Sequence, residues 1–329
     1  MLDINTKKIK KNAFRVTKRR GYAASRVRVP GGSLSSEELL QVAAIANTYG
    51  NGEVHLTTRQ GFEIPNIRYE DIPKVNEMLQ PIIDSLGVKQ AEGSPAGCGY
   101  TSAGTRNICA CIGNNVCPFA NTNTSRIAKR IDSTVFPHDL HFKIAITGCP
   151  NDCIKARMHD FGLIASTIPQ LDRDRCVTCG ACEKTCRMKV TKAITMVNGR
   201  PVRDHAKCIG CGECVMNCPT GAFTRSEKVY FRLAIMGRTG RKNPRLAQDF
   251  VVWADEDACV KIIQNTYKYV TNYINLNAPG GKEHIGYIVD RTGYHEFKKW
   301  ALEGVELGTE AIVKDQINWN GINYGLHYN

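Results

Sequence analysis

The stretch CVTCGACEKTC, residues 176–186, decides how this chain is organised. It spaces four cysteines as C-x2-C-x2-C-x3-C. The stretch CIGCGECVMNCP, residues 208–219, repeats that spacing, and each of its cysteines lies 32 residues after its counterpart. The two stretches form an internal repeat, so we expect them to fold together as one unit.

The spacing of the repeat predicts two [4Fe-4S] clusters that exchange one ligand. Three thiolates on a tight turn fit three corners of an iron–sulfur cube, and the fourth cysteine reaches the cube of the other repeat. Small residues between the ligands would let backbone N–H groups approach the sulfurs. A pair of zinc sites is the alternative, but tetrahedral zinc usually takes two spaced pairs of ligands. The predicted ligand sets are Cys176, Cys179, Cys182 and Cys218 for one cluster, and Cys208, Cys211, Cys214 and Cys186 for the other.

Bulk composition places the chain among ordinary globular proteins, with 42% hydrophobic and 23% charged residues over 329 positions. No apolar run reaches the roughly eighteen residues of a membrane span, and the N-terminus lacks the apolar stretch of a secretory signal. We therefore expect a cytoplasmic protein without a membrane partner. In a reducing compartment, clustered thiols favour metal binding over disulfides.

Positive charge gathers at the N-terminus. The net charge is +13, and residues 1–28 hold ten Lys or Arg against one acid. Such an arm is a solvated tail, or it binds a polyanionic cofactor or an acidic protein surface. We do not expect nucleic-acid binding, because few aromatic residues accompany the charge and no binding module follows it.

Periodicity on both sides of the cysteine block predicts a larger host domain. Residues 26–86 indicate a compact βαββα unit, with a strand at 26–30, a helix at 35–52, strands within 53–65 and a helix at 69–87. Residues 91–125 indicate loops that wrap a ligand. A strand at 142–147, renewed strand character at 229–237 and helices at 256–274 and 295–305 complete the pattern. The cysteine block is therefore predicted to be an insertion into a domain whose sheet continues on either side.

Four further cysteines come from two separate segments. CIGNNVC, residues 111–117, has C-x5-C spacing, and TGCPNDC, residues 147–153, has C-x3-C spacing. Two pairs brought together by the fold can hold either zinc or an iron–sulfur cluster, so spacing alone leaves the metal open.

Several motifs now occur together and in order. LTTRQG (56–61), TRNICAC (105–111) and the two cysteine pairs, with VRVPGG before them and GYIVDRTGYHEF after, resemble the sirohaem and [4Fe-4S] nitrite and sulfite reductase family. The resemblance implies an α+β fold: a ferredoxin-like half-domain plus a sirohaem-binding α/β domain, with an inserted 2[4Fe-4S] ferredoxin domain. The expected boundaries are 1–90 for the basic arm and half-domain, 91–170 with 226–329 for the sirohaem/[4Fe-4S] domain, and 171–225 for the insertion.

The same resemblance implies the cofactor ligands. Cys111, Cys117, Cys149 and Cys153 would ligate a third cubane, and the Cys153 sulfur would also be the axial ligand of the sirohaem iron. Asn151 would lie against the macrocycle. The other expected cofactor contacts are Thr57, Thr58, Arg59, Gln60 and Asn107.

The cationic residues that would bind the substrate anion follow from the same motifs. Arg59 and Arg106 match two family arginines, Lys143 matches one of two lysines, and His141 replaces the other. Residues 141 and 143 are two apart on a predicted strand, so both would face one side. The alternatives are a surface ion pair for Arg59 and a buried structural role for His141.

A basic segment near the C-terminal half, MGRTGRKNPR at 236–245, is either a solvated loop or a binding site for the sirohaem carboxylates. We expect Arg238 and Arg241 to bind the cofactor, because a polycarboxylate must be neutralised by such groups.

Together these features predict a sirohaem-dependent sulfite reductase catalytic subunit, which reduces sulfite to sulfide with six electrons. No G-x-G-x-x-G fingerprint is present, so electrons are expected from a partner. The resemblance implies that this partner comprises an iron–sulfur electron-transfer subunit and an FAD/NADH-oxidising subunit. A sirohaem nitrite reductase and a sirohaem-free electron-transfer protein are the alternatives. The half-domain motif occurs once, so either a second protomer supplies another copy in a homo-oligomer or one copy suffices.

Overall fold

A computed structural model describes residues 13–90, 104–240, 244–278 and 283–317. The chain divides into two compact units. Unit 1 comprises 1–110, 125–145 and 267–288, and unit 2 comprises 111–124, 146–266 and 289–329. This division differs from the domain boundaries expected from the sequence, which stay a prediction. None of the helices in the described ranges has the length and apolar character needed to cross a bilayer.

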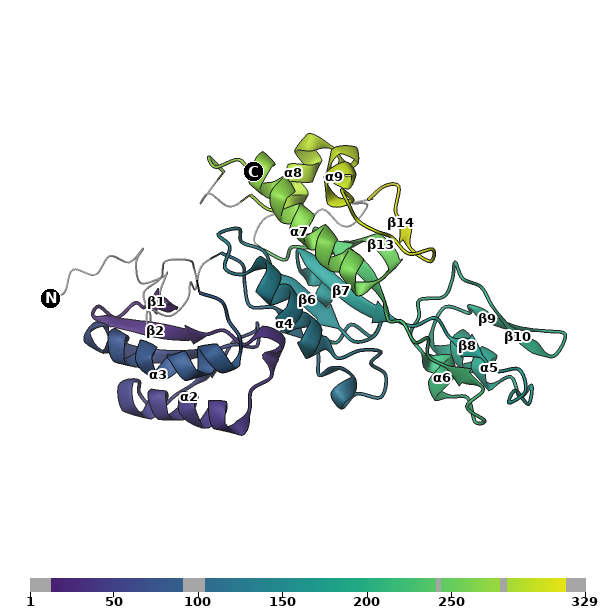
Figure 1. Cartoon of the computed structure of the whole chain (residues 1–329), viewed down its shortest axis with the longest axis horizontal. Coiled ribbons are helices and arrows are strands. Elements are labelled where there is room, and N and C mark those ends of the chain that lie inside the picture. The colour runs from purple at the N-terminus through teal and green to yellow at the C-terminus, as the bar shows by residue number, and fades with distance from the viewer. Residues whose placement is uncertain (1–12, 91–103, 241–243, 279–282, 318–329) are drawn as a thin grey trace. The chain divides into compact units, whose positions relative to one another are not determined.

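Unit 1 contains a four-stranded antiparallel sheet with two helices beside it (Figure 1). The strand order is β1-β2-β4-β3, from β1 (Phe14–Val16), β2 (Tyr22–Val27), β4 (Phe62–Arg68) and β3 (His55–Leu56). Helix α2 (Ser36–Tyr49) lies between β2 and β3 in sequence, and α3 (Ile72–Ser85) follows β4. The predicted βαββα unit is confirmed, with one additional strand, β1, before it.

Local sequence explains how this unit folds. Ser35 caps α2, since its Oγ accepts a hydrogen bond from Glu38 N at 3.1 Å while Glu38 Oε2 accepts one from Ser35 N at 2.7 Å. Ile45 of α2 and Ile64 of β4 are both fully buried in the core of this unit. The helix therefore begins at a defined residue and its apolar face covers the sheet.

The basic N-terminal segment is only partly an arm. Its residues 13–28 include β1 and β2, and Phe14 is fully buried. The interpretation of residues 1–28 as a solvated tail is therefore wrong for the described part, whereas residues 1–12 lie outside the described ranges. Strand pairing places these arginines on a sheet, where their charges must be compensated.

A second sheet has six strands in the order β14-β13-β12-β7-β6-β5. The strands are β14 (Ile312–Val313), β13 (Gln248–Ala254), β12 (Tyr230–Ile235), β7 (Phe161–Ser166), β6 (Ile144–Thr147) and β5 (Cys109–Ala110). β6, β12, α7 (Glu256–Tyr273) and α9 (Tyr294–Ala301) agree with the predicted elements. β7 was not predicted: all six of its residues are buried, so it has no polar alternation to reveal it. α4 (Thr124–Val135), β13 and α8 (Ile285–Thr292) were also not predicted.

The cysteine block leaves and rejoins unit 2 at neighbouring residues. β8 (Gln170–Leu171) pairs antiparallel with β11 (Phe223–Thr224), and Thr167 Oγ1 lies 3.1 Å from Ser226 Oγ. Within the block lie α5 (Ala181–Lys189), the hairpin of β9 (Ile194–Val197) with β10 (Arg200–Arg203), and α6 (Glu213–Met216). Gly180 and Gly212 precede the two helices with φ of +72° and +77°, a conformation that favours glycine.

Candidate functional site

Unit 2 gathers the four cysteines of the two separate pairs. Cys149 is buried, and burial raises the pKa of its thiol, which nearby Cys117, Cys153 and Cys111 raise further as like charges. The backbone N–H of Gly148 donates to Cys111 Sγ at 3.1 Å. Thiolates this close repel one another, so their ionised form needs a positive centre between them.

Two residues of the TGCPNDC loop shape the surroundings of the cysteines: Gly148 lies beside Cys111, and Asp152 precedes Cys153. A Cβ on Gly148 would lie 2.6 Å from Ala120 Cβ, so the close approach beside Cys111 requires glycine. Asp152 has a φ of +48°, and its Oδ1 accepts a hydrogen bond from Ala156 N at 2.7 Å. The loop thereby leaves Asn151 and Cys153 exposed.

The insertion assembles its eight cysteines in two groups. One cavity is lined by Cys176, Cys179, Cys182 and Cys218. In the other group, burial first and then neighbouring thiols that include Cys208 and Cys186 raise the pKa of Cys211 to about 11 and that of Cys214 to about 12. The first group thus contains three cysteines of one repeat and the fourth of the other, as the predicted ligand exchange requires, and Cys186 of the first repeat lies near the thiols of the second.

Backbone donors also face these sulfurs. Ala193 N donates to Cys186 Sγ and Ala222 N donates to Cys218 Sγ, both at 3.2 Å. No set of three or more His, Cys, Asp or Glu in the described ranges is arranged to hold a single metal ion. A four-iron cube takes its ligands at its corners and needs a wider ring of thiols.

Unit 1 contains a cavity of about 340 Å³ whose walls are strongly cationic. Five arginines and one carboxylate, Glu63, line it. The predicted residues Arg59, Arg106, Thr57, Thr58 and Asn107 are among the lining residues; Gln60, His141 and Lys143 are not. The full lining is Arg15, Arg26, Val27, Arg28, His55, Thr57, Thr58, Arg59, Gly61, Glu63, Thr105, Arg106 and Asn107. Such a cavity suits a small or multiply charged anion.

Arg15 and Arg26 were not predicted to belong to this site. Both ion-pair with Glu63, Arg26 Nε at 2.9 Å and Arg15 Nη1 at 3.2 Å from its Oε1. Burial acts to raise the pKa of Glu63, but these two partners hold it below its usual value. The signal was available: Arg26 and Arg28 alternate with valines in RVRV, which places both on one side of an extended chain.

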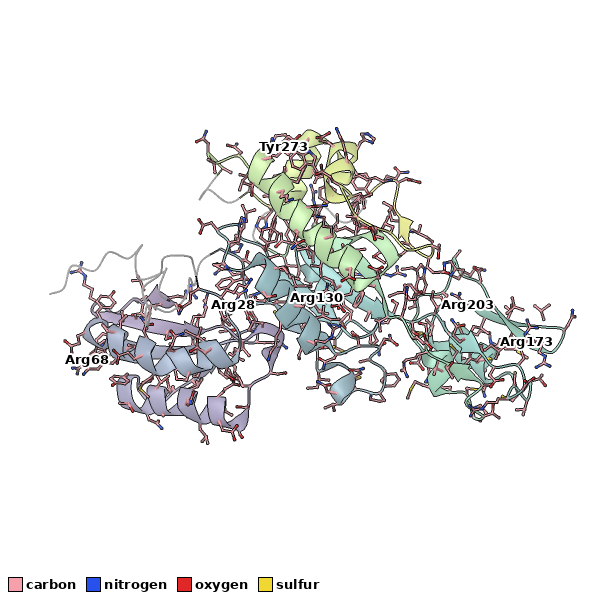
Figure 2. The ribbon with its side chains drawn as sticks, in the orientation of Figure 1. Arg28, Arg68, Arg130, Arg173, Arg203 and Tyr273 are labelled. Atoms are coloured by element: carbon pink, nitrogen blue, oxygen red, sulfur yellow. The ribbon has the colours of Figure 1, made fainter. Side chains whose placement is uncertain are left out.

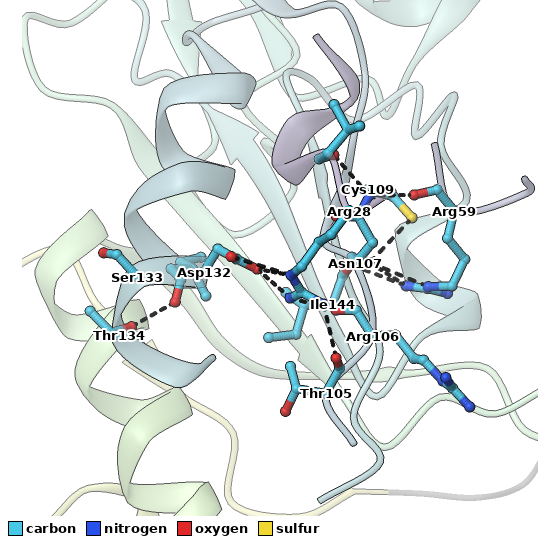
Figure 3. A network of polar contacts seen from close by, with 12 residues as sticks. Arg28, Arg59, Thr105, Arg106, Asn107, Cys109, Asp132, Ser133, Thr134 and Ile144 are labelled. Atoms are coloured by element: carbon cyan, nitrogen blue, oxygen red, sulfur yellow. Dashed lines mark hydrogen bonds and ion pairs between the residues drawn. The ribbon is translucent and has the colours of Figure 1, made fainter. Parts of the chain in front are cut away.

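Arg59 and Asn107 hold each other in place (Figure 3). Arg59 Nε and Nη2 donate to the carbonyl of Asn107 at 3.3 and 3.2 Å, and Asn107 Nδ2 donates to the carbonyl of Arg59 at 2.6 Å. Gln60 exchanges two hydrogen bonds of 2.7 Å with the backbone of Ala110. The TTRQ loop is thereby fixed to the TRN segment, with Gln60 as a connector outside the cavity lining.

A buried ion pair supports the TRN segment from behind (Figure 3). Arg28 pairs with Asp132 of α4, and their side chains are only 5% and 4% exposed. Arg28 also donates to the carbonyls of Thr105 and Arg106 at 3.0 and 3.2 Å. Its guanidinium lies 3.7 Å from the centroid of the Phe136 ring. Arg28 therefore fixes the backbone from which Arg106 extends.

The electrostatic environment of Arg106 in this cavity is strongly perturbed. Burial, followed by the charges of four other arginines that include Arg26 and Arg59, lowers its pKa to about 10. Its Nε donates to His141 Nε2 at 2.9 Å. His141 and Lys143 precede β6, which begins at Ile144, so the expectation that they share one face of a strand was wrong. His141 instead reaches the cationic group through Arg106.

The basic segment at 236–245 is only partly described. Arg238 is 3% exposed and exchanges two backbone hydrogen bonds of 2.8 Å with Arg245, so it is not part of a solvated loop. Arg245 Nη1 donates to Asp290 Oδ1 at 3.0 Å. Arg241 lies outside the described residues.

The fold and these thiol and arginine groups define a redox protein built to bind an anion, and the sequence comparisons agree. Residues 101–309 match the nitrite and sulphite reductase 4Fe-4S domain, and residues 16–82 match the nitrite/sulfite reductase ferredoxin-like half domain. The chain belongs to the nitrite and sulfite reductase family, so the resemblance found in its motifs and the α+β fold that it implied are confirmed.

Among its relatives is one component of the anaerobic sulfite reductase of Salmonella typhimurium, 41% identical over 94% of this chain and 92% of that protein. The coenzyme F420-dependent sulfite reductase of Methanocaldococcus jannaschii is 28% identical over 49% of this chain and 24% of its own. The solved structure of dissimilatory sulfite reductase I has the same fold, with a TM-score of 0.62 and 16% identity over 90% of this chain and 72% of that one.

The buried pair makes a stability prediction. Asp132→Asn leaves the Arg28 charge buried without its counter-charge, so we expect the free energy of unfolding to fall by about 3–5 kcal/mol. Denaturant unfolding measures the loss. Glu70→Gln removes the exposed Arg68–Glu70 pair and should cost less than about 1 kcal/mol. Equal losses in the two variants would contradict a special role for Arg28.

The lowered pKa of Arg106 makes a second prediction. Below pH about 10 the folded chain keeps this charge although burial, and after it the nearby arginines, disfavour it. In the unfolded chain the Arg106 charge is in water and away from the other arginines. Arg106→Gln should therefore stabilise the protein at pH 7 by about 1 kcal/mol. As pH rises above about 10, the folded wild type loses the proton and with it the cost of burying a charge beside other arginines, so the difference in stability should shrink. Unfolding curves at pH 7 and above pH 10 test both signs; destabilisation at pH 7 would refute the argument.

Proposed function

We propose that the chain is the catalytic subunit of a sirohaem-dependent sulfite reductase and reduces sulfite to sulfide. The observation that carries the proposal is the five-arginine cavity in a chain that also gathers twelve cysteines in three groups of four. Similarity along nearly the whole chain to a component of an anaerobic sulfite reductase favours sulfite as the substrate.

The residues present fit the proposed cofactors. Cys111, Cys117, Cys149 and Cys153 would hold one [4Fe-4S] cluster, and the exposed Cys153 would reach the sirohaem iron. The eight cysteines of the insertion, residues 171–225, would hold two more clusters. Arginine is the side chain best suited to bind carboxylates and sulfur oxyanions, because its planar fork donates two parallel hydrogen bonds.

When bound, sirohaem coupled to its cluster supplies the electrons for breaking S–O bonds. The chain's own residues provide charge and protons. Arg106 and Arg59 would attract and orient the dianion in a cavity where a surplus of positive charge strengthens binding. Each departing oxygen takes two protons and leaves as water. His141 is proposed as a proton relay beside the arginines, a role supported by the hydrogen bond that its Nε2 accepts from Arg106. Lys143 is proposed as a further cation.

The two alternatives make different demands on the chain. A nitrite reductase would use the same cofactors and the same cationic cavity, but the near-full-length relative belongs to a sulfite reductase. A sirohaem-free electron carrier would have no use for five arginines around one cavity, whose repulsion costs stability. Electrons would come from a separate iron–sulfur protein and a flavoprotein that oxidises NADH, for which the relative's designation as one subunit of an enzyme gives general support.

The cofactor content is the first prediction of this proposal. Anaerobically purified protein should contain about one sirohaem and about thirteen iron atoms per chain. Cys153→Ala should lose the sirohaem absorption while the iron of the insertion stays. Extracted tetrapyrrole, iron and acid-labile sulfide measure these contents. Iron near eight without tetrapyrrole in the parent chain would instead favour the electron carrier.

The cationic cavity makes a kinetic prediction. Arg106→Lys removes the bidentate donor and should lower kcat/KM for sulfite by about 100-fold with a reduced dye as electron source. Arg68→Lys, an exposed arginine outside the cavity lining, is the matched control and should change little. Competition between sulfite and nitrite in the same assay reports substrate preference; a higher kcat/KM for nitrite would overturn the choice of sulfite.

A further inference from the structure

The two cysteine repeats of the insertion have unequal surroundings. In the second repeat, the Gly210 carbonyl accepts a hydrogen bond from Thr167 N at 3.0 Å, and a Cβ on Gly210 would lie 2.7 Å from Ser166 Cβ. Arg225 donates to Asn121 Oδ1 at 3.0 Å and to the carbonyl of Pro118, next to Cys117, at 2.8 Å. The second repeat is therefore packed against the host part of unit 2.

The first repeat faces solvent at the equivalent positions. Thr178 is the counterpart of Gly210 and has a similar positive φ, +56° against +67°, yet it is exposed where Gly210 is buried. Val177 is 61% exposed and Cys179 is also exposed, and both line the cavity of the first cysteine group. On α5, Met188 is 70% exposed. The first cysteine group therefore lies beneath an accessible surface with apolar side chains.

Charge distinguishes the segments around the two repeats more strongly. Residues 172–207 hold nine Lys or Arg against four acids, whereas residues 208–226 hold one of each. Outside residues 1–28 and 172–207, the chain has 25 Lys or Arg and 26 acids. Apart from the N-terminal segment, the chain's surplus positive charge thus lies around the first repeat. Figure 2 shows Arg173 and Arg203 on this part of the molecule.

Most of this charge is exposed and not neutralised. Eight of the nine basic residues are exposed, and within the described ranges Lys184, Arg187 and Lys192 have no carboxylate partner. Arg187 also replaces the proline that ends the second repeat, Pro219. Lys184 and Arg187 are three residues apart and share one side of α5, while Cys182 and Cys186 are buried on another.

We propose that this first-repeat face, made by residues 173–179, the exposed side of α5 and the β9–β10 hairpin, is the docking surface for an acidic electron-donating protein. The inference rests on the proposed function, which requires an external donor, and adds which face receives it and what charge the donor carries. Complementary charge speeds encounter and fixes orientation, and the exposed Val177 and Met188 supply apolar contact close to the first cysteine group.

The test uses the full-length, cluster-loaded protein and a small acidic ferredoxin as the probe. Calorimetric titration at about 50 mM salt should show saturable binding that weakens at least about tenfold at 300 mM. The variant Lys184→Glu with Arg187→Glu should weaken binding by at least about tenfold while iron content per chain is unchanged. The matched control, Lys74→Glu with Lys89→Glu, makes the same charge change at exposed positions of unit 1 and should bind like the parent.

Failure to bind the acidic ferredoxin, or an equal loss in the two double variants, overturns the docking surface. Sulfite reduction driven by a small reduced dye needs no protein donor, so both double variants should retain it. If the parent chain itself fails to reduce sulfite with the dye, the proposed function fails, and the binding result is read independently.

Discussion

Repulsion among five arginines around one cavity is the constraint on which the rest of unit 1 depends. Glu63 is the one carboxylate among the lining residues, so most of the arginine charge must be compensated by other groups. Asp132 neutralises Arg28 from behind, Glu63 holds Arg15 and Arg26, and backbone carbonyls accept from Arg59. Arg106 is partly buried and close to the other four arginines, and together these two effects lower its pKa. The proposed role of Arg106 in anion binding therefore opposes its contribution to stability.

Sequence patterns predicted the features that depend on short-range spacing. Capping residues and alternating polarity predict the helices and strands of the half-domain. The 32-residue spacing between the two cysteine stretches predicts the cysteine groups of the insertion. The motifs also identified Arg59, Arg106 and Asn107 as neighbours of one cavity, although they lie far apart in the chain.

The missed features depend on tertiary contacts. β7 is buried along its whole length, so it carried no alternating signal. Arg15 and Arg26 were interpreted as part of a basic tail, because net charge does not distinguish a tail from strands that line a cavity. Asp132 had a readable signal: it lies on the side of α4 that also carries the buried Ile131 and Ala128, where a carboxylate implies a buried partner. Nothing local identifies that partner as Arg28.

The hydrogen bond between Thr167 and Ser226, which joins the two ends of the inserted domain, bears on how a domain can be inserted into a sheet. β7 and β12 pair antiparallel, with Ser166 opposite Tyr230, so the two strands form a hairpin whose turn has been replaced by an entire domain. The entropic cost of closing a connection between two strands grows only slowly with the length of the connection. The Thr167–Ser226 hydrogen bond fixes the two ends of this one. Such a sheet can therefore gain or lose the whole cysteine-rich domain at a single turn, without any change to its core.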